Sequence, residues 1–484
     1  MNFSTPFSKS RLDSLSLFSI LWAVATIFHL LSFPEDVRLL HPISWLSGVA
    51  AVAVFLFPRS ILLLVLLLCF RIADVWQWIP FIPNHIFFEF LLNIGMLLAI
   101  GWSYCKQSRE SATERLDLAD AGVRERFFQS FAPVARISLL ILYFFAVLHK
   151  LNWDYLNPAS SCGTFLLNGI AAKRLPFLPS GEWVELSAVW GTLLLEAGIP
   201  LMLCFRRTRT AGILIGMVFH FFLSIHPHRG IYSFSALMFS LYVLFTPPDF
   251  PQKLQEVLHA LGRKWQTAPF LLKAVGMCSL PAFALLAWLN WYDRLYIAGF
   301  LYWSAWAAAA MLLFVLVLLG GSGYAGIRPE SIFRIKTPFL WLVPALLFFN
   351  GMSPYLGLKT ESSFSMFSNL RTEGGKTNHL FMPNTIRLTN FQEDLVEVTE
   401  TDAEEFQVLL DKEKYITSFE FQRVASEIKR DFRALYKRNG KQDTLIVKGG
   451  ISNRPELTSP HSWFFNKFFY FRYIDKEGPC KCMH

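Results

Sequence analysis

The chain has 484 residues, of which 53% are hydrophobic and only 17% are charged, and its mean hydropathy is +0.37. Soluble domains carry about 25% charged residues, so this chain has too little polar surface to cover a water-facing globule of its size. The net charge of +9 would suggest a nucleic-acid partner in a soluble protein, but in a membrane protein a basic excess is typical of cytoplasmic loops. We therefore expect a polytopic α-helical membrane protein whose partner is the lipid bilayer, with no nucleic acid bound.

Apolar segments of about 20 residues are long enough to cross a bilayer as helices. In chain order the candidate spans are 14–33, 43–57, 61–79, 85–104, 131–150, 183–205, 210–228, 230–247, 271–290, 298–319 and 338–355. The second of these is short, so a count of about nine to eleven transmembrane helices stays open. We expect residues 1–355 to form the transmembrane domain.

The composition changes after Tyr355, where polar and apolar residues begin to alternate. The pattern predicts strands at 385–399 and 444–448, with a helix at 418–437 between them. We therefore expect residues 356–484 to form a small C-terminal domain of α+β or β-rich fold.

Basic residues predict the orientation of the helices. With a cytoplasmic N-terminus, the inside segments hold 18 Lys and Arg residues and the short outside loops hold five. Because Lys and Arg concentrate in cytoplasmic loops, this distribution favours that orientation, and an odd number of spans places the C-terminal domain outside. We expect a multi-pass protein of the plasma (inner) membrane with an extracytoplasmic C-terminal domain.

Ionisable side chains inside a bilayer are costly and mark candidate functional sites. In the predicted orientation nearly all of them lie in the outward-facing half: His29, Arg71, Asp74, His85, Glu89, His149, Lys150, His220, His226 and His228. Only Glu196 lies near the middle of the membrane. The pattern predicts a polar chamber that opens to the outer side.

Several of these residues also have a structural interpretation. Arg71 and Asp74 are three residues apart on one helix face, which is typical of an ion pair that stabilises a bundle. Glu89 is a candidate partner for Arg71 or Lys150, and Lys150 is also long enough to extend to the lipid headgroups. Pro227 interrupts the histidine-rich segment and no carboxylate lies near it in sequence, so we expect no metal site.

Lys150 has the chemistry of a catalytic base. A lysine at a dry membrane edge loses hydration, which favours the neutral amine. With His149 beside it and carboxylates nearby, such an amine is suited to abstract a proton. Asn152 and Asp154 follow in a segment that cannot continue as a helix past Pro158, so we expect a loop over the chamber.

The segment from Ala146 to Tyr155 (AVLHKLNWDY) resembles the end of a membrane helix in vitamin K-dependent γ-glutamyl carboxylases, and more closely the His-Lys-Leu-Asn core of bacterial HTTM (horizontally transferred transmembrane domain) proteins. The pairs Asn84-His85 and Phe219-His220 also resemble this family. The segments 351–355 and 364–370 resemble the family's last helix and the strand beyond it.

The resemblance implies a membrane enzyme in the inner membrane of a bacterium. It implies that Lys150 deprotonates reduced vitamin K or menaquinol, with His149 as its neighbour and with O2 and CO2 as co-substrates. The product would be a carboxylated glutamate in a secreted peptide or protein. His85, Glu89, Asn152, Asp154, His220, Arg71 and Asp74 would then line the substrate or cofactor site.

One observation keeps a second function open. The carboxylases carry a histidine before the lysine helix, whereas residues 105–148 contain none. The alternative is a non-catalytic membrane protein of the HTTM family that serves binding, assembly or immunity.

The seven cysteines have no CxxC spacing and predict no disulfide scaffold, which leaves Cys480 and Cys482 either paired or free.

Overall fold

The computed structural model describes residues 12–33, 41–110, 121–228, 230–266, 292–321, 332–382 and 386–482. The chain divides into two compact units, each assembled from separate segments. The first unit comprises Met1–Gln77, Phe88–Leu140 and Ala197–Pro344. The second comprises Trp78–Phe87, Ile141–Glu196 and Ala345–His484.

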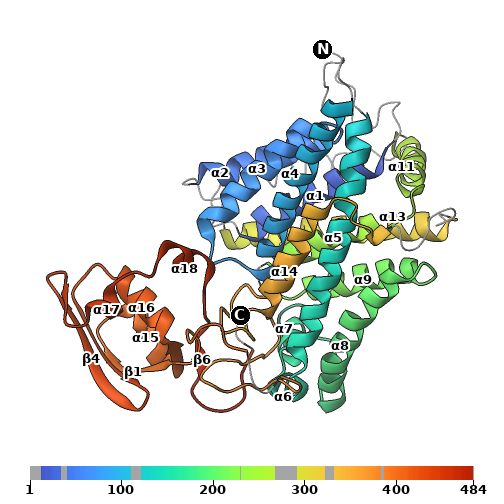
Figure 1. Cartoon of the computed structure of the whole chain (residues 1–484). Coiled ribbons are helices and arrows are strands. Elements are labelled where there is room, and N and C mark those ends of the chain that lie inside the picture. The colour runs from blue at the N-terminus through green and yellow to red at the C-terminus, as the bar shows by residue number, and fades with distance from the viewer. Residues whose placement is uncertain are drawn as a thin grey trace. The chain divides into compact units, whose positions relative to one another are not determined.

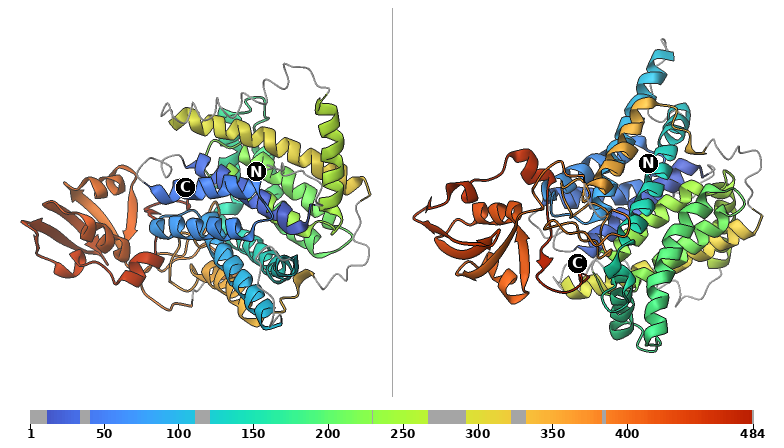
Figure 2. Two further views of the ribbon diagram at one scale, coloured as in Figure 1. Left: turned by 90° about the horizontal axis from the view of Figure 1, so that it is seen from above. Right: turned by 60° about the horizontal axis from the view of Figure 1, so that its bottom comes forward.

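Helices dominate the described residues up to Met352 (Figures 1 and 2). They are α1 (Ser14–Ser32), α2 (Pro42–Leu56), α3 (Ile61–Trp78), α4 (Asn84–Glu110), α5 (Ala121–Lys150), α6 (Trp153–Leu156), α7 (Cys162–Lys173), α8 (Glu182–Cys204), α9 (Arg209–Ser224), α10 (Ile231–Tyr242), α11 (Phe250–Gln266), α13 (Tyr292–Leu319) and α14 (Leu342–Met352), with the 3₁₀ helices η1 (Val243–Phe245) and η3 (Pro338–Trp341).

Six helices of the described residues are long and apolar enough to cross a membrane: Ser14–Ser32, Ile61–Trp78, Asn84–Ser108, Gly122–Lys150, Glu182–Cys204 and Ile297–Leu319. Three predicted spans correspond to shorter apolar helices, Pro42–Leu56, Arg209–Ser224 and Pro338–Met352. The predicted span 271–290 lies outside the described residues. The expected multi-helix apolar architecture is therefore confirmed, but its full-length helices in this part of the chain are fewer than the nine to eleven predicted.

One further candidate span is broken. Ile231–Phe245 and Phe250–Arg263 are together long and apolar enough for one span, but the two helices are bent by 115°. Pro247 and Pro248 lie at the break, and proline both removes a helical hydrogen-bond donor and excludes the preceding residue from helical geometry. The chain therefore turns sharply here, and α11 buries only part of its surface, including Phe250 and Leu254.

The first unit has α1 near its centre, packed against α2, α10 and α13. Aromatic rings fill the space between these helices, and Phe28 meets the Trp303 ring edge-on at 5.4 Å between centroids. Gly299 allows a close approach, because a Cβ atom there would lie 2.8 Å from the Tyr232 hydroxyl oxygen. Small residues at such contacts let membrane helices pack closely.

The C-terminal part of the second unit contains a six-stranded antiparallel sheet. Its strands are β1 (Leu395–Thr401), β2 (Lys414–Thr417), β3 (Phe432–Arg438), β4 (Lys441–Lys448), β5 (Ile451–Ser452) and β6 (Ile474–Asp475), in the spatial order β5-β4-β3-β1-β2-β6. The accompanying helices are α15 (Glu404–Asp411), α16 (Ser418–Glu427), α17 (Pro455–Thr458) and α18 (Trp463–Phe468). Burial alternates along β1 and β3, and α15 and α16 pack on the buried side (Figure 1).

Two predicted elements of this domain are wrong in their bounds. The helix predicted at 418–437 ends at Glu427, and its last third is strand β3, whose residues Phe432, Ala434 and Tyr436 point into the core. The strand predicted at 385–399 begins only at Leu395. The small C-terminal domain of mixed helix and strand is otherwise as expected, and the strand predicted at 444–448 lies within β4.

Candidate functional site

Lys150 is the last residue of α5, and its side chain forms a buried ion pair. The Nζ atom lies 2.7 Å from Oε2 of Glu196 on α8 and 3.2 Å from the carbonyl oxygen of Ala146. Only 6% of the Lys150 side chain and 12% of the Glu196 side chain are exposed. A buried charge is stable only when it is paired and hydrogen-bonded, so these contacts tie the end of α5 to the interior of α8.

A tyrosine closes one side of this pair. Lys150 Nζ lies 5.9 Å from the centroid of the Tyr155 ring, and Tyr155 is fully buried. Burial raises the pKa of Tyr155 well above its ordinary value, so the hydroxyl group keeps its proton at neutral pH. Tyr155 therefore contacts the ion pair as a neutral ring.

His149 points to a different set of partners from its neighbour. Its Nε2 atom lies 3.1 Å from the carbonyl oxygen of Gly351, and the residue is fully buried. The ring of Tyr355 lies between His149 and His379, with 5.5 Å between centroids on each side. His149 thus packs against the end of α14, whereas Lys150 pairs with α8.

His379 joins the end of the lysine helix from far along the chain. Its Nε2 atom lies 3.0 Å from the carbonyl oxygen of Leu148, and its backbone pairs with Asn152 in an isolated antiparallel bridge. Burial lowers the pKa of His379, which favours the neutral ring. Sequence reasoning missed this residue because 230 positions separate it from His149.

The loop of residues 353–382, here called the connecting loop, is irregular. The strand expected at 364–370 does not form. Ser362, Phe364, Phe367 and Asn369 have φ values of 53°, 66°, 54° and 55°, a region that non-glycine residues rarely adopt. Such residues cost about 1–3 kcal/mol each and persist only where their surroundings fix them.

Buried asparagine side chains fix the connecting loop. Asn84 accepts a hydrogen bond from the Phe364 amide, and Asn350 donates to the Ser362 carbonyl oxygen at 2.9 Å. Asn152 donates to the carbonyl oxygens of His149 and Ser368, both at 2.7 Å. It also caps α6 by accepting from the Tyr155 amide. Every hydrogen of the Asn152 amide is thus engaged in shaping the turn after Lys150.

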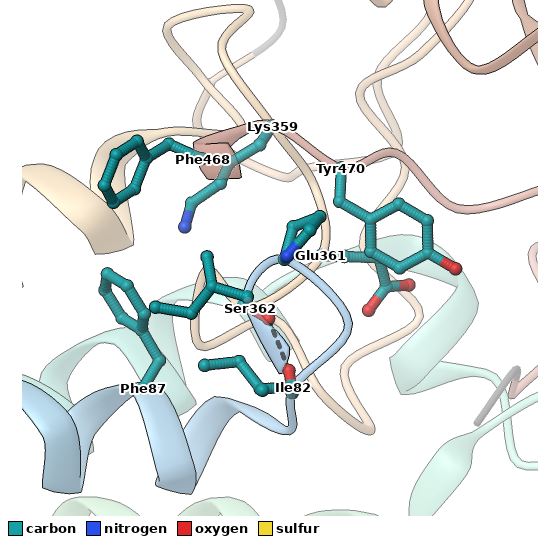
Figure 3. A pocket seen from close by; sticks show the side chains of 9 residues that line it. Ile82, Phe87, Lys359, Glu361, Ser362, Phe468 and Tyr470 are labelled. Carbon is teal, nitrogen blue, oxygen red and sulfur yellow. Dashed lines mark hydrogen bonds between the residues drawn. The ribbon is translucent and has the colours of Figure 1, made fainter. Parts of the chain in front are cut away.

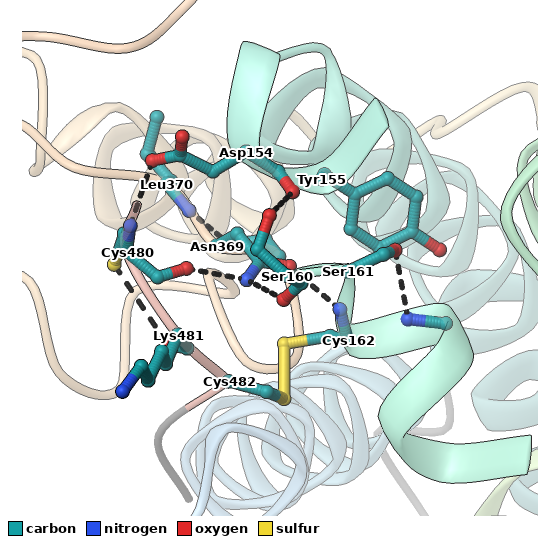
Figure 4. Close-up of a disulfide and its surroundings, with 12 residues drawn as sticks. Asp154, Tyr155, Ser160, Ser161, Cys162, Asn369, Leu370, Cys480, Lys481 and Cys482 are labelled. Atoms are coloured by element: carbon teal, nitrogen blue, oxygen red, sulfur yellow. Dashed lines mark hydrogen bonds between the residues drawn. A yellow bond between two sulfur atoms is a disulfide. The ribbon is translucent and has the colours of Figure 1, made fainter. Parts of the chain in front are cut away.

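Asp154 and Asn369 connect this turn to the C-terminal segment (Figure 4). Asp154 Oδ2 accepts hydrogen bonds from the Cys480 amide at 2.9 Å and from the Asn378 side chain at 2.7 Å. Asn369 accepts from the Cys162 amide at 2.8 Å and donates to the Cys480 carbonyl oxygen at 2.6 Å. Asp154 therefore positions backbone rather than standing free in a cavity.

A disulfide bond closes the same region. Cys162, the first residue of α7, is bonded to Cys482, with 320 residues between them in sequence (Figure 4). Cys480 is a buried free thiol. Of the two cysteines that the sequence left either paired or free, Cys482 is paired and Cys480 is free. Cysteine spacing gives no sign of Cys162 as the partner, because it carries no information on a residue so far away.

Arg71 and Asp74 belong to the first unit, where they form the ion pair that their spacing predicts, at 2.8 Å. Glu89 pairs with Arg71 through two hydrogen bonds, at 3.0 and 3.1 Å. Ser44 donates to Asp74 at 2.7 Å, and Asn93 donates to Glu89 at 3.4 Å. A buried polar network therefore links α2, α3 and α4, and of the two partners considered for Glu89, Arg71 is the one present.

The two remaining predicted residues lie in different units. His85 is buried near the start of α4 in the second unit, and His220 is buried on α9 in the first unit. His220 meets the Phe234 ring edge-on at 5.1 Å between centroids. Within the described part of the chain, no cluster of three or more His, Cys, Asp or Glu side chains has a metal-binding arrangement.

Glu196 is the second residue that sequence reasoning left out of the site. Its predicted position as the single deep charge was the available signal, since a carboxylate inside a membrane requires a partner. Lys150 is that partner, 46 positions earlier in the sequence. The residues predicted for the outward-facing half therefore do not include Glu196, the carboxylate that pairs with Lys150.

Comparison with known proteins identifies one family. The family model of the HTTM domain matches residues 26–250, which include Lys150 and Glu196. No curated protein and no solved structure is significantly similar to the chain. Together with the six long apolar helices, the match indicates a multi-pass membrane protein. Residues 26–250 of the chain therefore match the HTTM domain.

Proposed function

We propose that this protein is a membrane enzyme in which Lys150 acts as a base on a lipid-soluble quinol, coupled to the modification of glutamate in a secreted peptide or protein. The observation that carries the proposal is the buried ion pair of Lys150 with Glu196, at 2.7 Å. The HTTM match over residues 26–250 supports the kind of chemistry, since this family includes carboxylase-like proteins.

The ion pair provides a route to a neutral amine. In surroundings of low polarity, transfer of a proton from the Lys150 ammonium to the Glu196 carboxylate removes both charges and their desolvation cost. The neutral amine then accepts a hydroxyl proton from an acidic substrate. Glu196 holds the first proton, and Tyr155, which stays protonated, excludes water from one side of the pair.

The donor set fits a quinol, because an amine backed by a carboxylate matches a weakly acidic ring hydroxyl. When bound, a reduced vitamin K or menaquinol would supply, with O2, the reducing equivalents and the strong base that removal of a glutamate γ-proton requires. CO2 would be the second co-substrate. The protein itself would hold Lys150 and Glu196 in contact and would provide the Lys150 amine as the proton acceptor.

We propose that this site faces the outside of the plasma (inner) membrane of a bacterium and that the N-terminus is cytoplasmic. The bond between Cys162 and Cys482 supports this orientation, because disulfides persist in oxidising compartments. Cys162 follows the lysine helix directly and Cys482 ends the C-terminal domain. Both would therefore lie on the outer side, as the distribution of Lys and Arg residues also favours.

A non-catalytic role in binding, assembly or immunity remains the second candidate. The observation that favours it is the same ion pair, because a buried lysine and glutamate can serve only to hold two helices together. This function predicts that Lys150→Met affects stability alone. Binding would then depend on residues 356–484.

The test is an assay on membranes that contain the full chain. The membranes are incubated with reduced menaquinone, labelled bicarbonate and glutamate-containing peptides. We expect label in the peptide with the wild-type chain and with Lys173→Met, which changes an exposed lysine of the same unit. Lys150→Met and Glu196→Gln should lose it. Equal incorporation in all four proteins, or none in any, would contradict the proposed enzyme.

A further inference from the structure

A small cavity of about 10 Å³ lies in the second unit, between the loop that precedes α4 and the connecting loop. Its walls are mainly apolar and aromatic, and they include Phe87, Phe468 and Tyr470. A cavity needs about 10–15 Å³ to hold one water molecule, so the space admits only a very small ligand. Lys359, Glu361 and Ser362 supply its polar groups.

The Lys359 side chain is aimed into this cavity. Its amine ends between the rings of Phe87 and Phe468 (Figure 3), with Nζ 4.4 Å from the Phe87 centroid. Only 8% of Lys359 is exposed. Among the described residues, no carboxylate lies within ion-pair distance of this amine. A lysine so deeply buried without a paired anion is unusual in a folded protein.

The surroundings of Lys359 favour the uncharged amine. Burial lowers the pKa of Lys359 to about 7, although the charge of Glu361 opposes the shift. About half of these amines are then neutral at neutral pH, whereas an ordinary exposed lysine is neutral in only about one molecule in 2,500. A neutral amine is a nucleophile, and this one faces a small space with mainly apolar walls.

We propose that Lys359 is a carbon dioxide-reactive lysine, and that its cavity is the site at which the side chain forms a carbamate. The Nζ lone pair forms a bond to the carbon of CO2, and one carbon–oxygen π pair moves onto oxygen. A proton leaves Nζ and, because Glu361 lies beyond direct contact with the amine, is relayed by water to the Glu361 carboxylate. The products are a carbamate anion on Lys359 and a neutral Glu361, with no oxidant or reductant needed.

The charges around the cavity accommodate this product. Burial raises the pKa of Glu361, so its carboxylate is a competent proton acceptor. Arg472 interacts electrostatically with Glu361 and is paired to Glu373 at 2.9 Å. Arg423 lies over the ring of Tyr470, which also lines the cavity, with its guanidinium carbon 5.6 Å from the ring centroid. The net charge of the site does not change, because the carbamate gains the negative charge that Glu361 loses when it takes up the proton.

The size of the cavity selects CO2 over other electrophiles. Aldehydes and ketones also react with neutral amines, but their substituents are bulkier than a linear triatomic molecule and require more room than this small cavity provides. CO2 is a linear triatomic molecule without hydrogen-bond donors, and the aromatic walls do not penalise its entry. The site is separate from the ion pair of Lys150, so the proposal stands whether or not Lys150 acts as a base.

The experiment traps carbamates on the purified full-length protein. The protein is equilibrated with isotopically labelled CO2 and treated with triethyloxonium, which ethylates carbamates, and the labelled lysines are located by peptide mass spectrometry. We expect label at Lys359 on the order of 100-fold above that at Lys376 and Lys441, which are exposed. An added peptide with a free α-amine provides the positive control.

Two variants sharpen the result. Lys359→Arg keeps the cation beside Phe87 but removes the reactive amine, so the label at this position should disappear while other lysines are unchanged. Glu361→Gln removes the proton acceptor and should reduce label at Lys359 several-fold. Label at Lys359 no higher than at Lys376, with the control peptide labelled, would overturn the proposal. Undiminished label in Glu361→Gln would overturn the assigned proton path.

Discussion

Replacement of Arg71 by methionine should destabilise the first unit strongly. Arg71 is fully buried and donates three charge-assisted hydrogen bonds, one to Asp74 and two to Glu89, at 2.8 to 3.1 Å. Arg71→Met leaves both carboxylates buried without a counter-ion. Breaking a buried pair by removing one partner costs about 3–5 kcal/mol, and two orphaned charges place the loss at the upper end.

The assay is thermal unfolding of the purified protein in detergent, followed by tryptophan fluorescence. A loss of about 3–5 kcal/mol corresponds to a fall in Tm of about 6–20 °C for a unit of this size. Arg206→Met, which changes an exposed arginine, is the matched control and should shift stability by less than about 0.5 kcal/mol.

A triple variant separates charge from packing. Arg71→Met combined with Asp74→Asn and Glu89→Gln removes all three charges, so most of the lost stability should return. If Arg71→Met unfolded at the wild-type temperature, the network would not support the fold. If the triple variant were no more stable than the single one, the loss would come from packing and the electrostatic explanation would be refuted.

Three further predictions concern the second unit. Lys150→Met leaves the Glu196 carboxylate without its partner and should lower the unfolding free energy by about 3–5 kcal/mol. Adding Glu196→Gln should restore most of this stability, whereas an additive loss in the double variant would contradict the ion pair. Cys162→Ser removes the bond to Cys482 and should lower the unfolding free energy by about 2–5 kcal/mol. A reductant should lower the Tm of the wild type but leave the Tm of the variant unchanged. Burial raises the pKa of Glu420 from 4.5 to about 8, so the folded state retains a proton that the unfolded state releases. This stabilisation is complete below about pH 4.5 and is lost as the pH rises through about 8, so the Tm of Glu420→Gln should fall less over this range than that of the wild type.

Features that depend on local sequence were predictable. The apolar stretch that ends at Lys150 becomes α5, and Lys150 is its last residue, as expected. Arg71 and Asp74 pair because residues three apart share one helix face. Both predictions follow from the helical period and from the energetic cost of a charge in apolar surroundings.

Contacts between distant parts of the chain were not predictable in this way. Glu196 lies 46 residues from Lys150, and the two cysteines of the disulfide are 320 apart. No spacing rule connects such positions, and His379 gave no signal because it follows the last predicted helix. The fold alone brings these residues to the end of α5.

The misassigned helix at 418–437 has a local cause. A capping pattern is present at its start, where Thr417 accepts a hydrogen bond from the Glu420 amide. The missed signal is Asn439-Gly440, with φ values of 51° and 74°. This dipeptide forms the tight turn of the β3–β4 hairpin, and the alternating residues before it belong to a strand.

Quinol-dependent oxygen uptake by the purified protein tests the central claim most directly, because it requires no knowledge of the peptide substrate. Wild type and the exposed-site control Lys173→Met should consume oxygen when reduced menaquinone is added. Lys150→Met should show no uptake above the rate without protein, and Glu196→Gln should be severely impaired. Uptake by Lys150→Met at the wild-type rate, or a wild-type protein that consumes no oxygen, would contradict the assignment of Lys150 as the base.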